Sequence, residues 1–233
     1  MSARSAARNR HSQNDRKKTT KILVVDDHPI VREGLANVFQ READFRVCGQ
    51  AEDRHQTFKL VASTRPDLVV MDLGLKGSLS FELIKDLRLQ HPDVQILVVS
   101  MHDEKIHAER AIRAGASGYI TKDDATIKIV DAVRQVLRGE IYLSQSLSAQ
   151  LISKLAGHSP ADNGSPLEKL TDRELQVFQM VGEGMGRREI ARQLNLDVNT
   201  VETYRARIRE KLYLADAREL LQFAIKYRHE VAA

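Results

Sequence analysis

Short apolar runs rich in valine, isoleucine and leucine alternate with longer amphipathic stretches over residues 21–143. The clearest runs span 22–25, 68–71 and 96–99, and weaker ones span 46–50 and 118–121. Unbroken apolar runs are expected for strands that helices cover on both faces of a parallel sheet. Strands that alternate with helices also favour parallel pairing, because each crossover needs a helix. The sequence therefore predicts a doubly wound α/β domain around a five-stranded parallel sheet.

Five amphipathic stretches lie between or after these strands, and we expect helices over 30–41, 54–63, 81–90, 105–114 and 126–138. The composition changes at 144–168, where glycine, proline, serine and asparagine gather. Such residues favour turns and loops, so this segment is expected to link two domains. Its first part, 147–155, has helical spacing and would either extend the first domain or form a short connector helix.

Residues 169–233 show only helical periodicity. Thr171 and Glu174 have the spacing of a capping box, which opens a helix that Gly184 and Gly186 close. Further helices are expected over 187–194, 198–212 and 217–227. With 233 residues the chain is long enough for two domains with cores of their own. We therefore expect a small all-α domain after the α/β domain.

The basic residues are concentrated at the N-terminus. Residues 1–21 hold seven lysines and arginines against one acidic residue, Asp15. The net positive charge of this segment therefore exceeds the net charge of +4 for the whole chain. A polar tail without apolar periodicity indicates a disordered, solvated extension over 1–20 more than a nucleic-acid-binding arm. Overall basicity is therefore weak evidence for DNA binding.

The composition also bears on location. No apolar stretch approaches the roughly 20 residues that a membrane-crossing helix needs, and the N-terminus shows no signal-peptide core. The single cysteine, Cys48, excludes an internal disulfide and a cysteine-rich metal site. We expect a cytoplasmic protein without membrane contact.

Acidic and polar side chains follow the predicted strands. Asp26 and Asp27 end the first strand and Asp72 ends the third, while Ser100 and Lys122 follow the fourth and fifth. Because the carboxyl ends of parallel strands form one edge, where ligands bind in open α/β sheets, these side chains should converge. Clustered carboxylates repel one another unless their pKa values rise or a divalent cation binds. All-oxygen ligands suit Mg²⁺.

The motifs KILVVDDHP, PDLVVMDLGL, ILVVS and GYITKD carry a resemblance to the receiver domain of two-component response regulators. This resemblance implies a flavodoxin-like sheet, a histidine kinase as partner, and Asp72 as phosphoacceptor. It further implies a magnesium site formed by Asp26, Asp27, Asp72 and the Gly74 carbonyl. The phosphoryl-binding and switch residues would be Ser100, Tyr119 and Lys122. A receiver catalyses only its own phosphoryl transfer and dephosphorylation, so no conventional enzyme is expected.

Each of these residues also has a simpler interpretation when taken alone. Asp26 could cap a helix, Asp72 could stabilise a turn, and Tyr119 could be ordinary core packing. Ser100 could be an ordinary loop hydroxyl and Lys122 a solvated lysine. Their shared position at one sheet edge favours the functional interpretation. We interpret His28, His102 and His107 as surface histidines, because they lack metal-ligand spacing.

The loop after Asp72 departs from the usual receiver pattern. Lys76 stands where receivers usually have proline, and Ser80 stands where they have glycine. The second change matters if that residue needs a positive φ. Neither change removes a reactive group, but both affect the expected rate of phosphorylation and the lifetime of the aspartyl phosphate.

The helices expected at 187–194 and 198–212 have the arrangement of a helix-turn-helix. Asp197 is placed to cap the second helix by accepting the amide of Asn199 or Thr200. An apolar stripe of Val201, Tyr204 or Arg205, Ile208 and Leu212 would face the core. Periodicity alone would equally fit any small helical bundle.

Residues 170–214 resemble the LuxR-type helix-turn-helix from end to end, which with the receiver motifs indicates the NarL/FixJ class of transcription regulators. The resemblance makes 198–212 the recognition helix, and it implies binding to double-stranded DNA and a homodimer that forms on phosphorylation or on DNA. The candidate DNA contacts are Asn199, Thr200, Glu202, Thr203, Arg205, Ala206, Arg207 and Lys211. Gly186 is a weaker cap than the serine or threonine usual at this position. Glu202 could accept from cytosine or be repelled by phosphate.

Three functions are compatible with these residues. The first is a transcription regulator switched by phosphorylation of Asp72. The second, which Lys76 and Ser80 suggest, is a phosphorylation-independent DNA-binding protein with an atypical receiver. The third is a magnesium phosphohydrolase with Asp72 as nucleophile, which would leave the helix-turn-helix without a purpose. Phosphorylation by acetyl phosphate separates the first two, and turnover of phosphate esters tests the third.

Overall fold

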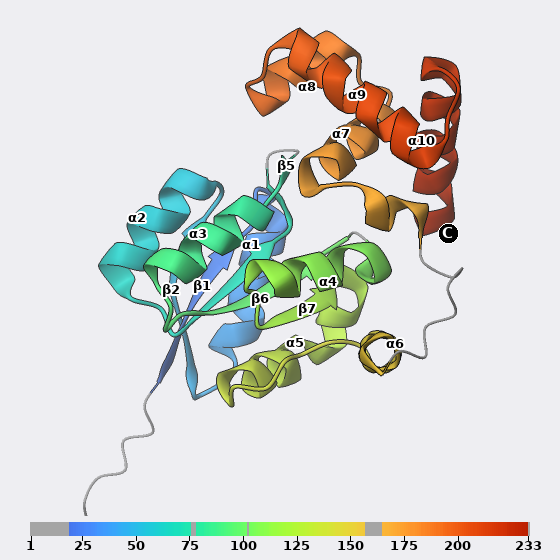
Figure 1. Ribbon diagram of the computed structural model, residues 1–233. Coiled ribbons are helices and arrows are strands. Elements are labelled where there is room, and N and C mark those ends of the chain that lie inside the picture. The colour runs from blue at the N-terminus through green and yellow to red at the C-terminus, as the bar shows by residue number, and fades with distance from the viewer. Residues whose placement is uncertain (1–18, 76–77, 102, 157–164, 233) are drawn as a thin grey trace, which may run out of the picture.

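The structure is a computed structural model that describes residues 19–75, 78–101, 103–156 and 165–232 (Figure 1). The expected basic tail lies almost entirely outside these residues, as do Lys76 and His102. Among the described residues, no helix is long and apolar enough to cross a membrane.

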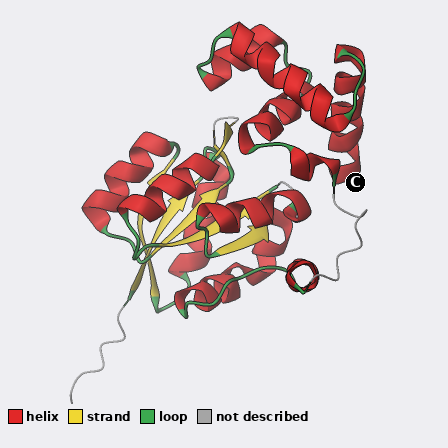
Figure 2. Ribbon diagram, in the orientation of Figure 1, coloured by secondary structure: helices red, strands yellow, loops and turns green. Residues whose placement is uncertain are grey.

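The N-terminal half is built on a five-stranded sheet with strand order β2-β1-β3-β6-β7, in which every neighbouring pair is parallel (Figure 2). This is the flavodoxin-like order, so the prediction of a doubly wound sheet is confirmed. The strands are β1 (Thr20–Val25), β2 (Phe45–Ala51), β3 (Leu68–Asp72), β6 (Gln95–Ser100) and β7 (Gly118–Thr121).

Five helices cover this sheet, and alternate strand residues point to its two faces. Ile22 and Val24 pack in a core with α1 (Pro29–Gln40) and α5 (Lys122–Leu137). Leu23 and Val25 pack in a second core on the other face, which is covered by α2 (Arg54–Thr64), α3 (Phe81–Gln90) and α4 (Glu104–Ala114). Burial on both faces explains why the strand sequences are apolar without alternation.

Two features of this half were not predicted. Helix α5 begins at Lys122 instead of residue 126, because the Thr121 side chain accepts the amide of Asp124 and so caps the helix directly after β7. A short antiparallel hairpin also follows β3, with β4 (Gly74–Leu75) paired to β5 (Ser78–Leu79). Both features bring residues next to the carboxyl edge of the sheet.

The segment after α5 contains helix α6 (Gln145–Leu155), whose Leu147 is buried in the core of the first half. This contact decides between the two alternatives for residues 147–155, because α6 extends the preceding core. A short 3₁₀ helix, η1 (Pro166–Lys169), then leads into the C-terminal half.

The C-terminal half consists of α7 (Asp172–Gly182), α8 (Arg187–Leu194), α9 (Val198–Leu212) and α10 (Ala217–Ala232) around one apolar core. The predicted capping box of Thr171 and Glu174 opens α7. The Asp197 side chain caps α9 by accepting the amide of Asn199 at 2.7 Å. Gly186 precedes α8 without a side-chain cap, as predicted.

Candidate functional site

The carboxyl edge of the sheet brings the predicted acidic residues together. Strands β1 and β3 are neighbours, with Val25 paired to Met71, so the aspartates that follow them are adjacent. Asp26, Asp27, His28 and Asp72 each offer a possible ligand atom, and these atoms all lie within 4.8 Å of one another. Asp26 is only 1% exposed and Asp72 only 6%. We call Asp26, Asp27, Asp72 and Lys122 the acidic pocket.

Lys122 lies in the first turn of α5 and bridges two of these carboxylates. Its Nζ is 2.8 Å from Asp26 Oδ2 and 3.0 Å from Asp72 Oδ2. Burial acts to lower the pKa of Lys122, but its hydrogen bonds and ion pairs with Asp26 and Asp72 outweigh burial and raise it. Lys122 is therefore a firmly protonated cation between the two carboxylates.

The acidic pocket carries more negative charge than Lys122 balances. Burial raises the pKa of Asp72, and the charge of Asp26 adds to this effect, although Lys122 acts in the opposite direction. The Gly74 amide donates to Asp72 Oδ1 at 3.2 Å, which places Gly74 beside the carboxylate. Three converging carboxylates with excess negative charge fit a hard divalent cation such as Mg²⁺.

Ser100 and Tyr119 form a buried pair beside the pocket. Ser100 ends β6 and is fully buried, while Tyr119 on β7 is 1% exposed. Their side chains are hydrogen-bonded to each other. Burial raises the pKa of the Tyr119 hydroxyl far above its usual value, so it remains protonated at any physiological pH.

Of the histidines interpreted as surface residues, one lies beside the acidic pocket and another is buried. His28 is exposed, but its Nδ1 lies 3.1 Å from Asp26 Oδ1 and 2.9 Å from Asp27 Oδ1. Its position directly after two aspartates was an available signal that the interpretation did not use. For His107 the prediction was wrong, because it is 2% exposed, stacks on Phe81 and accepts from the Gln179 side chain at 3.0 Å.

The departure at Ser80 has a small structural consequence. Ser80 precedes α3 with φ −89° and ψ 19°, a negative φ that does not require glycine. A positive φ is not needed there, so the loss of the usual glycine does not strain this loop.

The candidate DNA contacts on α9 fall into two groups, exposed and half-buried. Val201 and Ile208 are buried, and Tyr204 and Leu212 pack against the same core, which identifies Tyr204 as the apolar member of the predicted stripe. The exposed candidates are Asn199, Thr203, Ala206 and Arg207, whose spacing places them on one face of the helix. The half-buried candidates are Thr200, Glu202, Arg205 and Lys211.

Two of the half-buried cations have partners within their own half. The Arg205 guanidinium lies 3.8 Å from Glu202, and its side chain is only 18% exposed. Lys211 Nζ lies 2.6 Å from Glu174 Oε2, and the same carboxylate oxygen accepts the Thr171 amide of the capping box. Lys211 therefore ties α9 to the first turn of α7. The capping-box spacing predicted the role of Glu174 at the helix start, but not this second contact.

Comparisons with known proteins find a matching family for each half of the chain. Residues 22–134 match the family "Response regulator receiver domain", and residues 168–224 match "Bacterial regulatory proteins, luxR family". Response regulator GacA of Pseudomonas aeruginosa is 35% identical over 207 residues, which cover 89% of this chain and 96% of GacA. The chain belongs to the response regulator family. Oxygen regulatory protein NreC of Staphylococcus haemolyticus is 31% identical and covers 88% of this chain and 97% of NreC.

Solved structures agree with this assignment. A LuxR-family response regulator from Aurantimonas shares 35% identity, with a TM-score of 0.55 over 59% of this chain and 99% of its own. RcsB of Salmonella typhimurium shares 20% identity, with a TM-score of 0.70 over 90% of this chain and 98% of its own, and supports the fold alone. The protein is thus a two-component transcription regulator with a receiver and a LuxR-type DNA-binding half, and not a conventional enzyme.

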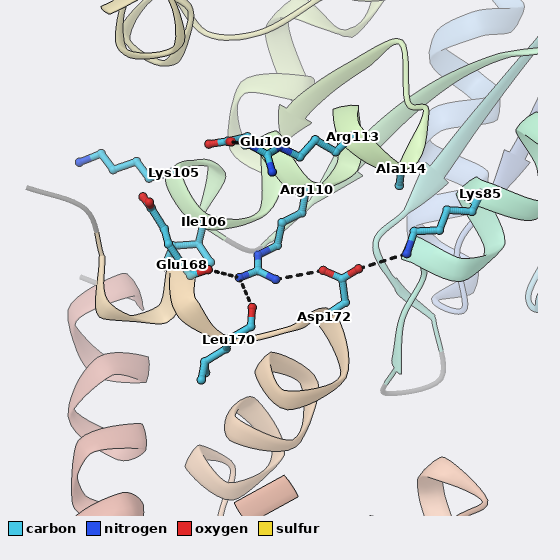
Figure 3. Close-up of a pocket in the computed structure, with 10 residues that line it drawn as sticks. All are labelled: Lys85, Lys105, Ile106, Glu109, Arg110, Arg113, Ala114, Glu168, Leu170 and Asp172. Carbon is cyan, nitrogen blue, oxygen red and sulfur yellow. Dashed lines mark hydrogen bonds and ion pairs between the residues drawn. The ribbon is translucent and has the colours of Figure 1, made fainter. Parts of the chain in front are cut away.

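The receiver contacts the DNA-binding half through α4. Arg110 on α4 donates to Asp172 Oδ1 at 3.0 Å and to the carbonyls of Leu167 and Leu170 at 3.0 and 2.6 Å (Figure 3). Lys85 on α3 lies 3.4 Å from the same aspartate. A cavity of about 410 Å³ lies beside these residues. The first turn of α7 is therefore tied to the receiver through Asp172 and to α9 through Glu174.

Proposed function

We propose that Asp72 accepts a phosphoryl group from a sensor histidine kinase, and that this modification controls dimerisation and DNA binding. The observation that carries the proposal is the acidic pocket itself. Asp72 is held against Lys122 at the edge of the sheet where ligands bind, beside two further carboxylates. The division into a tail at 1–20, a receiver at 21–143, a linker at 144–168 whose helix α6 packs on the receiver core, and a DNA-binding domain at 169–233 is part of the same proposal, as is a cytoplasmic location.

In the proposed reaction the Asp72 carboxylate attacks the phosphorus of a kinase phosphohistidine. A bond forms between phosphorus and a carboxylate oxygen while the bond between phosphorus and the imidazole nitrogen breaks. Asp26, Asp27, Asp72 and the Gly74 carbonyl would hold Mg²⁺, which stabilises charge on the transferring group. Lys122, already paired with Asp72, would pair with a phosphoryl oxygen.

Ser100 and Tyr119 would then report the modification. A phosphoryl oxygen is a strong acceptor, so it competes for the Ser100 hydroxyl that is now bonded to Tyr119. Loss of that bond weakens the hydrogen bonding of a buried, protonated tyrosine, which favours reorientation of its side chain. The modification thus shifts the receiver between two conformations.

The exposed face of α9 is suited to the major groove of DNA. Asn199, Thr203 and Ala206 would face base edges, and Arg207 would contact a phosphate or a base. Thr200, Glu202 and Arg205 border this face, and Lys211 at its far end would contribute least because Glu174 already binds it. RcsB, which shares the fold, has been solved bound to promoter DNA and as dimers on DNA. A homodimer reading two half-sites is the form we propose.

The test is Mg²⁺-dependent phosphorylation by acetyl phosphate, followed by measurement of the molecular mass in solution. Wild type should take up phosphate and shift towards a dimer, and Asp72→Asn should do neither. Asp93→Asn, at an exposed aspartate away from the acidic pocket, is the matched control and should behave as wild type. Phosphate uptake by Asp72→Asn would contradict the phosphoacceptor assignment. No uptake by wild type would favour the phosphorylation-independent regulator.

A further inference from the structure

We propose that Leu79 is a positioning residue that couples Asp72 to helix α7, through the β4–β5 hairpin that follows the phosphoacceptor. This inference rests on the proposed function and names a route by which the state of Asp72 reaches the DNA-binding half. The route needs two links, one from Asp72 to Leu79 and one from Leu79 to α7.

The first link is made by the backbone of the hairpin. The Gly74 amide donates to Asp72 Oδ1 at 3.2 Å, and Gly74 is the register partner of Leu79 in the antiparallel pair. The Ser80 amide closes the loop by donating to the Leu73 carbonyl at 2.8 Å. Leu79 is therefore fixed to the residue whose amide binds the phosphoacceptor, so a shift of Gly74 is passed to Leu79.

The second link is made by apolar packing. Among the described residues that are only partly buried, Leu79 alone packs against both the receiver core around α3 and α4 and the core of the DNA-binding half. Strand β5 contacts α7, and Figure 1 shows the hairpin projecting from the receiver towards that helix. Ile106 of α4 is buried in the same C-terminal core, so Leu79 lies at an apolar seam between the halves.

Phosphorylation acts on the first link directly. Attack by Asp72 converts its carboxylate into an acyl phosphate, which removes the carboxylate charge and places phosphoryl oxygens beside the Gly74 amide. A hydrogen bond to a charged acceptor is stronger than one to a neutral acceptor, so the Gly74 contact must change. Packed interfaces tend to occupy one of two discrete arrangements. A small shift of Leu79 can therefore break the apolar contact between the hairpin and α7.

This route differs from the contact made by Arg110. Arg110 lies on α4 and holds η1 and α7 by hydrogen bonds to Leu167, Leu170 and Asp172 of the C-terminal half. The receiver contacts α7 and η1, while α8 and α9 lie on the outer side of the DNA-binding half (Figure 1). Docking therefore fixes the direction in which α9 points, and release of α7 changes that direction.

The test compares full-length wild type, Leu79→Ala and Leu89→Ala by hydrogen exchange of α7, each with and without Mg²⁺ and beryllofluoride, a phosphoryl analogue. Leu89 is the matched control, because it is a leucine on α3 with 82% of its surface exposed. In wild type and Leu89→Ala, beryllofluoride should accelerate exchange at the start of α7 by about fivefold or more, the lower end of ordinary coupling between sites. In Leu79→Ala, exchange should be fast already and respond little to the analogue.

Leu79→Met separates coupling from simple structural loss, because methionine of similar volume keeps the apolar contact and should restore the response to beryllofluoride. Phosphorylation of all variants by acetyl phosphate is measured in parallel. If Leu79→Ala takes up phosphate and its α7 responds as strongly as in wild type, the role of Leu79 is refuted while the phosphoacceptor function stands. If wild type takes up no phosphate, the proposed function fails and the coupling fails with it.

Discussion

The acidic pocket and the outer face of α9 are the two regions expected to carry function, and they are built in opposite ways. In the pocket, Asp26 and Asp72 are nearly buried and share one cation, Lys122. On α9, Asn199, Thr203 and Arg207 are exposed to solvent. The pocket is organised before its ligand arrives, whereas the helix presents side chains whose positions DNA would determine. Substitutions in the pocket should therefore have large effects on phosphate uptake that other residues cannot compensate. Substitutions on α9 should have smaller, additive effects on DNA binding.

The largest effect is expected for Lys122→Met, which removes the shared cation while keeping most of the side-chain length. Phosphate uptake from acetyl phosphate should fall by roughly 100-fold, the usual cost of removing one positioned charge from a phosphoryl or oxyanion site. Lys128→Met is the control, because Lys128 lies on the same helix α5 but pairs with Asp124 at the surface. Equal uptake by Lys122→Met and Lys128→Met would show that the pocket is not preorganised in the way that the contrast requires.

A second prediction separates two cations of the same helix. Lys211→Met should lower the free energy of unfolding by about 1–3 kcal/mol, because it leaves the buried Glu174 carboxylate without its cation. Arg207→Met should leave stability within about 0.5 kcal/mol, since Arg207 is exposed. Urea denaturation of each full-length variant measures both values.

For DNA binding we expect the opposite order, with a larger effect of Arg207→Met than of Lys211→Met. Arg207→Met should weaken binding to a random-sequence duplex and lower the slope of log affinity against log salt by about one, as expected for a lost phosphate contact. Lys211→Met should leave that slope unchanged once the protein is folded. If Lys211→Met lowers the slope as Arg207→Met does, the ion pair with Glu174 opens on DNA and Lys211 belongs to the exposed group after all.

The sequence predicted the pocket better than the helix face, for a physical reason. In a doubly wound sheet, the end of each central strand has a fixed place, so finding the apolar runs was enough to bring Asp26 and Asp72 together. On α9 the helical period showed which residues share a face, but not that Lys211 reaches a carboxylate 37 positions earlier in the chain. That contact depends on how α7 and α9 pack, which periodicity does not contain.

The same limit explains the other misses. His107 has a polar side chain on an amphipathic helix, and it is buried between Phe81 of α3 and Gln179 of α7, two helices whose packing against α4 the helical period does not contain. The β4–β5 hairpin consists of two strands of two residues each, too short for any alternation to be recognised. Local signals succeeded where chemistry is local, as with the Thr171 and Asp197 caps.

The smallest predicted effect tests such a local rule in the DNA-binding half. Gly186 precedes α8 in an extended conformation, with φ −75° and ψ 156°, and a Cβ built there meets no atom within 4 Å. Gly186→Ser should therefore fit without strain and supply the side-chain acceptor that the first turn of α8 lacks, raising stability by a few tenths of a kcal/mol. Gly186→Ala adds the Cβ without the hydroxyl and should be less stable than Gly186→Ser by about 1 kcal/mol. Urea denaturation followed by circular dichroism measures both. If serine and alanine have equal effects, capping is not what limits α8, and the packing of Ile190 and Leu194 in the core determines its stability instead.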